Sequence, residues 1–210
     1  MNRIISFTRI ALALVGIGLA LAACGYNTIP TLEEEAKARW AEVENQYQRR
    51  ADLIPNLVAT VQGYAAQEKN VLTAVVEARA KATQVKVDAS QLTDPDKVKA
   101  FENAQNQLSG ALGRLLAVVE NYPDLKSNAN FLALQSQLEG TENRITVARN
   151  RYIQAVQTFN TTIRSFPGNL TAMVFGYKTK PNFSVENEAV ISKPPTVDFG
   201  GPSPVPAAAK

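Results

Sequence analysis

The sequence contains no histidine and a single cysteine among its 210 residues. A Ser-His-Asp or Cys-His catalytic site is therefore excluded, and so is a zinc site built from histidine and cysteine. A di-iron helical bundle needs Glu-x-x-His pairs, which this chain cannot supply. Neither a GxxxxGK[ST] nor a GxGxxG phosphate-binding motif occurs. We therefore expect no metal, no cofactor and no enzymatic activity.

A long apolar run is also missing. The longest, residues 10–23, has 14 residues, whereas a membrane-spanning helix normally needs about 18 or more. This run follows Arg3 and Arg9, with no acidic residue before it, and it ends in small residues next to Cys24. A basic start, a short apolar run and small residues are typical of a secretory signal.

The residues Leu21-Ala22-Ala23-Cys24 resemble a bacterial lipobox, in which the cysteine thiol takes a diacylglycerol with acyl chains such as palmitate and the cysteine becomes the new N-terminus after cleavage. We expect residues 1–23 to be a lipoprotein signal peptide and residues 24–30 a lipidated linker. Each buried CH2 of the acyl chains would add about 0.8 kcal/mol to membrane attachment. Residue 25 is Gly and not Asp. By the sorting rule for such lipoproteins, this residue indicates the outer membrane, facing the periplasm, with the inner membrane as the alternative.

The overall charge gives little reason to expect a nucleic-acid partner. The chain has 22 basic and 19 acidic residues, and removal of residues 1–23 leaves 20 and 19, a formal balance of +1. A nucleic-acid-binding surface needs a basic stripe together with a recognisable motif, and neither is present. We expect no nucleic-acid binding.

The body of the chain has helical periodicity. Apolar residues step by three and four along three series, which begin at Trp40, Phe101 and Phe131 and end at Val85, Tyr122 and Phe166. This spacing is typical of helices that pack as in a coiled coil. A strand would show sustained alternation of apolar and polar residues, which is absent from the sequence, so we expect no major sheet. The pattern predicts an all-α protein with an antiparallel up-and-down four-helix bundle over residues 31–176. Residues 177–210 hold most of the prolines and predict an extended Pro-rich tail.

Local signals place the helix ends. Thr31-Leu32-Glu33-Glu34 is a capping-box pattern, and Asp94-Pro95 fits a cap followed by proline at the first helical position. Pro123 and Pro167 should end the second and third series, because proline disfavours a helical conformation at the preceding residue. A short helix is expected after Pro167, from Asn169 to Phe175.

Pro55 leaves two arrangements open for the first helical region. A helix from Leu32 to Val85 would be about 80 Å long at 1.5 Å per residue, with much of its apolar seam uncovered. A break at Ala51–Asp52, with Asp52 as a cap and Pro55 in the next first turn, avoids this. We favour this break, which gives helices over 31–50, 53–87, 95–121 and 128–166. The unbroken spacing across Arg50–Ile54 favours instead one kinked helix over 31–87.

Several stretches resemble the LemA family, in the same order along the chain. They are Arg49-Arg50-Ala51-Asp52-Leu53-Ile54-Pro55-Asn56-Leu57-Val58, Glu120-Asn121-Tyr122-Pro123-Asp124-Leu125, Glu142-Asn143-Arg144-Ile145, Arg164-Ser165-Phe166-Pro167-Gly168-Asn169 and Val197-Asp198-Phe199. The resemblance implies an envelope-anchored four-helix bundle of undetermined biochemical activity, without a catalytic residue or cofactor. Many members keep an uncleaved N-terminal span, whereas this chain has the lipobox-like residues before Cys24.

Arg50 and Glu68 are the only charged residues on the three apolar series. Because they are far apart on one helix, each should meet a partner elsewhere, and the last helix offers Glu142, Arg144 and Arg149. Paired buried charges would fix the helix register. The alternative is a recognition site at the far end of the first helix, formed by Arg49, Arg50, Asp52, Pro55 and Asn56.

Together these features predict a non-enzymatic envelope lipoprotein that works as a membrane-anchored interaction or scaffold module. The expected partners are the membrane, through the acyl chains, and an envelope protein of unknown identity. The alternative is a self-assembling, membrane-shaping structural protein that keeps its N-terminal span.

The intact mass of the membrane-extracted protein tests the anchor. We expect a mass reduced by residues 1–23 and raised by acyl chains, and we expect both changes to be absent in the Cys24→Ala variant. A full-length, unmodified mass of the wild-type chain would contradict lipidation and indicate an uncleaved span.

Overall fold

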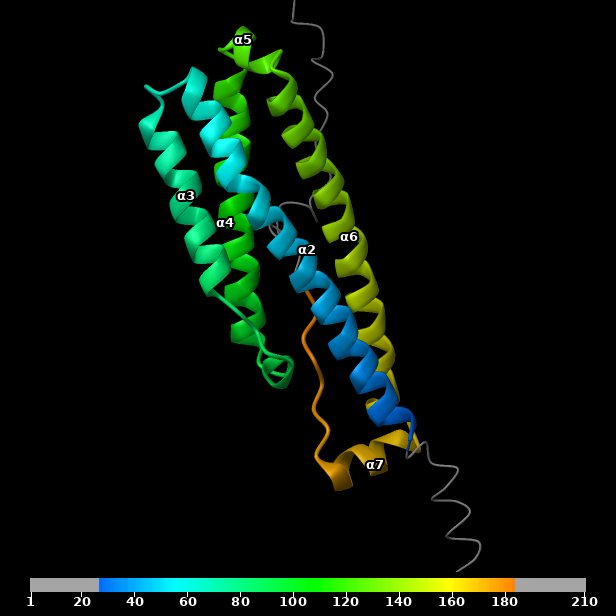
Figure 1. The fold of residues 1–210 in the computed structure, drawn as a ribbon. Helices are drawn as coiled ribbons and strands as arrows, with labels where there is room; N and C mark the ends of the chain where they lie inside the picture. The colour runs from blue at the N-terminus through cyan, green and yellow to red at the C-terminus, as the bar shows by residue number, and fades with distance from the viewer. Residues whose placement is uncertain (1–26, 184–210) are drawn as a thin grey trace, which may run out of the picture.

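The computed structural model describes residues 27–183, whose regular structure is helical throughout (Figure 1). Its four long helices are α2 (Thr28–Tyr64), α3 (Lys69–Gln84), α4 (Pro95–Val119) and α6 (Ala129–Arg164). The shorter elements are η1 (Ala89–Gln91), α5 (Pro123–Lys126) and α7 (Gly168–Phe175). The expected signal peptide, Cys24 and the tail beyond Phe183 lie outside the described residues.

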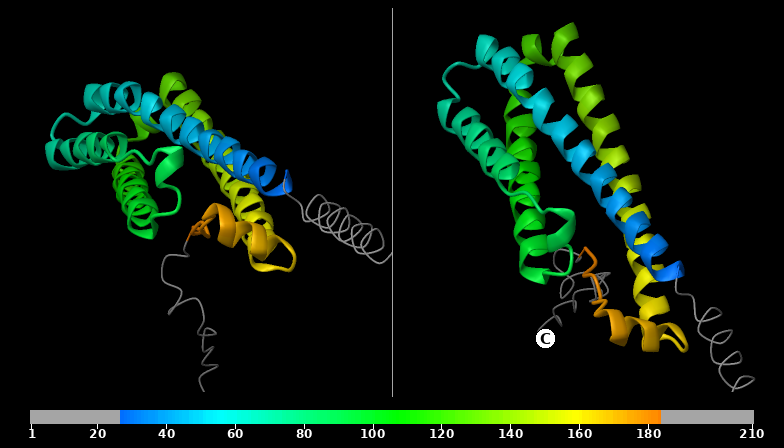
Figure 2. Two further views of the ribbon diagram at one scale, coloured as in Figure 1. Left: turned by 90° about the horizontal axis from the view of Figure 1, so that it is seen from below. Right: turned by 60° about the horizontal axis from the view of Figure 1, so that its bottom comes forward.

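The long helices run alternately up and down, which confirms the all-α, up-and-down bundle (Figure 1). The two longest, α2 and α6, lie side by side along their length, and the shorter α3 and α4 form a second pair. This second pair lies against the C-terminal half of α2. We call the end with the α2–α3 turn and α5 the distal end, and the end with Thr28 and α7 the basal end (Figures 1 and 2).

The expected break at Ala51–Asp52 is wrong, because α2 continues through Pro55 to Tyr64. A single helix over 31–87 is wrong as well, since the chain leaves the helix at Ala65 and α3 starts at Lys69. Ala51, Ile54 and Leu57 are all buried, so the apolar seam continues across the proline without a change of face. The seam thus stabilises a helix that the proline alone would interrupt.

The caps of the other helices agree with the sequence signals. The Asp94 side chain accepts hydrogen bonds from the backbone N–H groups of Asp96 and Lys97, with Pro95 as the first helical residue of α4. Helices α4 and α6 end before Pro123 and Pro167, as expected. The capping role of Thr31 is wrong: α2 starts at Thr28, and the Thr31 hydroxyl donates to the Asn27 carbonyl at 2.8 Å inside the first turn.

The distal half is filled by aliphatic side chains from all four long helices, including Ile54, Leu57, Val75, Leu108 and Leu115. The half nearer the basal end is aromatic and is centred on Trp40, whose ring lies 5.2 Å from Phe101 and 5.1 Å from Tyr152. The Trp40 indole N–H donates to the Val87 carbonyl at 2.9 Å, in the segment between α3 and η1. Loop backbone thus satisfies a polar atom of a buried ring.

The chain after α7 packs back into the basal half (Figure 2). Phe183 is buried and stacks on Trp40 at 5.7 Å. The Asn160 side-chain amide pairs with both backbone polar groups of Lys180, at 2.8 and 2.9 Å. The buried Lys180 ammonium donates to Glu33 at 3.0 Å. Residues up to Phe183 therefore belong to the packed body, beyond the expected boundary at 176.

Candidate functional site

A buried guanidinium joins three of the long helices. Arg50 on α2 is only 1% exposed, and its Nη1 donates to Glu142 on α6 at 2.9 Å and to Ser109 on α4 at 2.8 Å. Its Nη2 donates to the carbonyl and side-chain oxygens of Gln105 on α4, at 3.1 and 2.7 Å. Among the described residues, Arg50 Nε has no hydrogen-bond partner. The expected pairing of Arg50 with Glu142 is therefore present.

Pro55 creates a second link, from α2 to α3. Proline has no N–H to donate to the carbonyl four residues earlier, which here is that of Ala51. That buried carbonyl accepts instead from Arg79 Nε of α3, at 2.7 Å. A buried backbone oxygen without a partner is costly, so Arg79 offsets part of the penalty of an interior proline. The proline is therefore compatible with a continuous helix.

Gln105 completes the connection between the helices. Its side-chain N–H donates to the Ala82 carbonyl at the end of α3, at 3.1 Å, while its oxygen accepts from Arg50. The four long helices thus meet at one level through a set that we call the polar junction: Arg50, Arg79, Gln105, Ser109 and Glu142. A shift of any one helix along its axis would separate donors from acceptors in this set.

A second ion pair lies next to the polar junction, between α6 and α4. Arg149 donates to Glu102 at 3.0 Å, and its guanidinium lies 4.4 Å from the Phe183 ring centre. The Glu102 side chain is buried and that of Arg149 is partly exposed. The Arg149 contact therefore also connects the bundle to the segment after α7. The third expected partner, Arg144, is exposed and donates to the Gly140 carbonyl of its own helix.

The expectation of a buried Glu68 needs correction. Glu68 is only partly buried, immediately before α3, and accepts a hydrogen bond from the Tyr122 hydroxyl at 2.8 Å. The neighbouring Gln67 donates to the same hydroxyl at 2.9 Å. The carboxylate raises the pKa of Tyr122, mainly through this hydrogen bond. Glu68 thus ties the α2–α3 turn to the α4–α5 turn at the distal end.

The expected recognition site at the end of the first helix is not at an end. Arg49, Asp52, Pro55 and Asn56 are exposed on the middle of α2, well before its last residue, Tyr64. Asp52 accepts from Gln48 of the same helix at 2.7 Å. Arg50, by contrast, is turned inward to the polar junction. The structure therefore divides the expected set into an exposed stripe on α2 and a buried cation.

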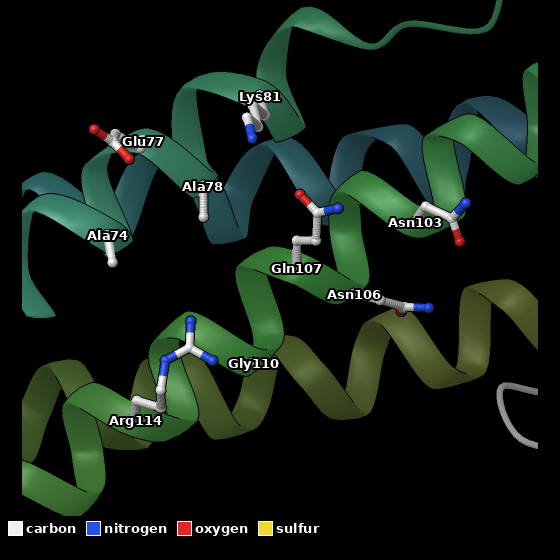
Figure 3. Close-up of a pocket in the computed structure, with 9 residues that line it drawn as sticks. All are labelled: Ala74, Glu77, Ala78, Lys81, Asn103, Asn106, Gln107, Gly110 and Arg114. Carbon is white, nitrogen blue, oxygen red and sulfur yellow. The ribbon is translucent and has the colours of Figure 1, made fainter.

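A groove of about 520 Å³ opens between α3 and α4 (Figure 3). Three small residues, Ala74 and Ala78 on α3 and Gly110 on α4, leave room between the two helices. The remaining lining is polar and comes from both helices: Glu77, Lys81, Asn103, Asn106, Gln107 and Arg114. Sequence reasoning missed this groove, although the small residues at helical spacing are its signal.

Between residues 27 and 183 there is no cluster of three or more acidic, histidine or cysteine side chains that could bind a metal ion. Within the same range, none of the helices combines the length and apolar character needed to span a bilayer.

Comparison with known proteins identifies the family. The model of the LemA family matches residues 39–199. The chain belongs to the LemA family. The polar junction lies inside the matched region, as does the α3–α4 groove.

Curated relatives of this LemA-family chain include two magnetosome proteins. Magnetosome protein MamQ 2 of Paramagnetospirillum magneticum is 29% identical over 174 residues, which cover 75% of this chain and 64% of the relative. Magnetosome protein MamQ of Magnetospirillum gryphiswaldense is 28% identical, over 73% and 62%. Protein LemA of Metamycoplasma hominis is 28% identical, over 59% and 52%. The chain thus spans less than two thirds of the length of these relatives.

The link through Pro55 can be tested with a double-mutant cycle. Arg79→Ala should lower the free energy of unfolding by about 1.5–3 kcal/mol, because it removes a charged donor from a buried carbonyl. In a Pro55→Ala background, the backbone N–H of residue 55 can donate to the Ala51 carbonyl. Arg79→Ala should then lower the free energy of unfolding by less than it does in the wild-type background, with a difference of about 1 kcal/mol or more. Chemical denaturation of the four proteins measures both costs.

Lys81→Ala, on the same helix, serves as the control and should cost equally little in both backgrounds. Equal costs of Arg79→Ala with and without Pro55 would contradict the link.

The polar junction predicts an asymmetry between two glutamates of α6. Glu142→Ala leaves the Arg50 charge buried without its counter-ion and should lower the free energy of unfolding by about 2–3 kcal/mol. The loss of one partner of a fully buried pair costs about 3–5 kcal/mol, and the value expected here is smaller because Glu142 is partly exposed. Glu139→Ala, which removes an exposed carboxylate that accepts a hydrogen bond from Gln135, should cost under about 0.5 kcal/mol. Urea unfolding distinguishes them, and coincident curves would show that Arg50 does not depend on Glu142.

Proposed function

We propose that this LemA-family protein is a non-enzymatic, membrane-anchored interaction module of the cell envelope, with the α3–α4 groove as its partner-binding surface. The observation that carries the proposal is the position of the groove in the distal part of the bundle. Arg79 and Gln105, on the two helices that form the groove, contact α2 at Ala51 and Arg50. Arg50 lies about 33 Å along α2 from Thr28 at 1.5 Å per residue.

The basal end would lie at the membrane. Helix α2 starts at Thr28, so only about 14 Å of extended chain separates it from Cys24. Acyl chains on Cys24, which cleavage after Ala23 would make the N-terminal residue, would hold the basal end against the bilayer. We propose the outer membrane, facing the periplasm, as the location, and the inner membrane as the alternative.

The lining of the groove favours a polypeptide partner. Asn103, Asn106 and Gln107 each carry both a donor and an acceptor, which matches the N–H and C=O groups of an extended peptide. Glu77 and Lys81 on α3 provide one negative and one positive charge, and Arg114 on α4 provides a second positive charge. Charges of both signs can pair with side chains of a partner segment and fix its direction.

Affinity capture from cross-linked cell envelopes tests the groove. The double variant Lys81→Glu/Arg114→Glu should lose most of the recovery of the partner that the wild-type chain captures, because both positive charges of the groove are reversed. Lys97→Glu/Lys99→Glu reverses two exposed charges on α4 outside the groove and should retain that recovery. Quantitative mass spectrometry of the captured proteins measures the difference.

Two outcomes would overturn the groove as the contact surface. Full recovery by the groove variant together with loss in Arg49→Ala/Asp52→Ala would move the contact to the exposed stripe on α2. Capture of further copies of this chain alone, together with large oligomers in sedimentation, would favour the alternative proposal of a self-assembling structural protein.

A further inference from the structure

Helix α7 packs on the bundle with its small residues inward. Gly168 and Ala172, one turn apart, are its buried residues. A Cβ on Gly168 would lie 2.3 Å from the Thr162 carbonyl oxygen, so only glycine permits this close approach to α6. The inward face of α7 therefore contributes little apolar area to the core.

The large apolar residues of the same helix point into solvent. Met173 is 80% exposed, Val174 78% and Leu170 51%, and Phe166 in the turn before α7 is 80% exposed. Leu170, Met173 and Val174 are spaced i, i+3, i+4, so they share one face of the helix. Full burial of a side chain of this kind stabilises the folded protein by about 1.5–3 kcal/mol, and these exposed side chains lack that stabilisation in water. We call these four residues the α7 apolar face.

The α7 apolar face lies at the basal end of the molecule. On the opposite side of α7, Ala172 packs in one cluster with Ile29, Phe159 and Ile163. Ile29 belongs to the first turn of α2, at most about 18 Å of extended chain from Cys24. Figures 1 and 2 show α7 beside the start of α2.

Cationic residues flank the α7 apolar face. The helix itself has no charged residue, whereas Arg164 before it and Lys178 after it are exposed. An apolar face between basic residues suits the boundary of a bilayer, where acyl chains take the apolar side chains and anionic headgroups take the cations. A second copy of this chain would fit less well, because a symmetric contact between two α7 faces would bring like charges together.

We propose that the α7 apolar face inserts into the acyl–headgroup boundary of the membrane to which the chain is anchored. The inference rests on the proposed anchoring at Cys24 and adds a second, non-covalent contact beside it. Two neighbouring contacts restrain rotation of the bundle about its short linker. The bundle then stands away from the bilayer, with the α3–α4 groove accessible to a soluble partner.

Depth-dependent quenching tests the insertion with the full chain in vesicles of phosphatidylethanolamine and phosphatidylglycerol. An environment-sensitive fluorophore is attached through Val174→Cys on α7, and through Val147→Cys on α6 as the matched control, since both valines are exposed. The parent chain, whose single cysteine is Cys24, gives the labelling background. We expect blue-shifted emission at 174 and quenching by nitroxide-labelled lipids several-fold stronger than at 147.

Vesicle flotation separates this inference from the anchor itself. Chains that float with the vesicles but show equal quenching at 174 and 147 would overturn the insertion of α7 and leave the anchor intact. Chains that do not float would overturn both proposals. Labelled chains that are not quenched at 174, together with an unlabelled Val174→Cys chain that oxidises to a disulfide-linked dimer where the parent chain does not, would overturn membrane insertion and assign the α7 apolar face to a second copy.

Discussion

The burial of one guanidinium constrains the relative positions of the long helices. Arg50 is buried, and its guanidinium is held by oxygen atoms from Gln105, Ser109 and Glu142. An apolar seam repeats every few residues and tolerates a slip of one helix along another, because aliphatic contacts are non-directional. A charged fork with fixed donor directions does not tolerate such a slip. The polar junction therefore specifies a single register, whereas the aliphatic residues around it contribute most of the burial.

Apolar spacing predicted the helical class, the up-and-down order and the inward position of Arg50, because burial of a helix face follows directly from its periodicity. It failed at Pro55, since the donor that replaces the missing N–H is Arg79, which lies on another helix. It also failed at Glu68, because α2 ends at Tyr64 and the turn moves Glu68 off the apolar face. Both errors concern interactions between residues distant in sequence, which local patterns do not record.

The unequal helix lengths divide the bundle into two different halves. Helices α3 and α4 lie mainly against the C-terminal half of α2. Helix α4 reaches the other half near its start, where Phe101 packs on Trp40, so that half needs further cover. That cover comes from the segment with η1 and from the chain after α7, which contribute Val87, Leu92 and Phe183 to the aromatic cluster around Trp40. The chain after α6 must therefore reverse direction at the basal end, and α7 forms part of that reversal. Helix α7 therefore lies at the basal end because the chain must turn there to cover the aromatic cluster.

The polar junction also connects the α3–α4 groove to α2, the helix that follows the proposed anchor at Cys24. Helix α3 is joined to α2 by a turn and to α4 by the segment that contains η1. Arg79 binds it to the Ala51 carbonyl, and Gln105 binds its last turn through the Ala82 carbonyl. Both groove-forming helices are thereby fixed to α2, whose first residue, Thr28, lies four positions after Cys24 in the sequence. With the chain anchored at Cys24 and a partner bound in the groove, as proposed, a load would pass through directional hydrogen bonds into α2 and from there to the membrane, as an anchored scaffold requires.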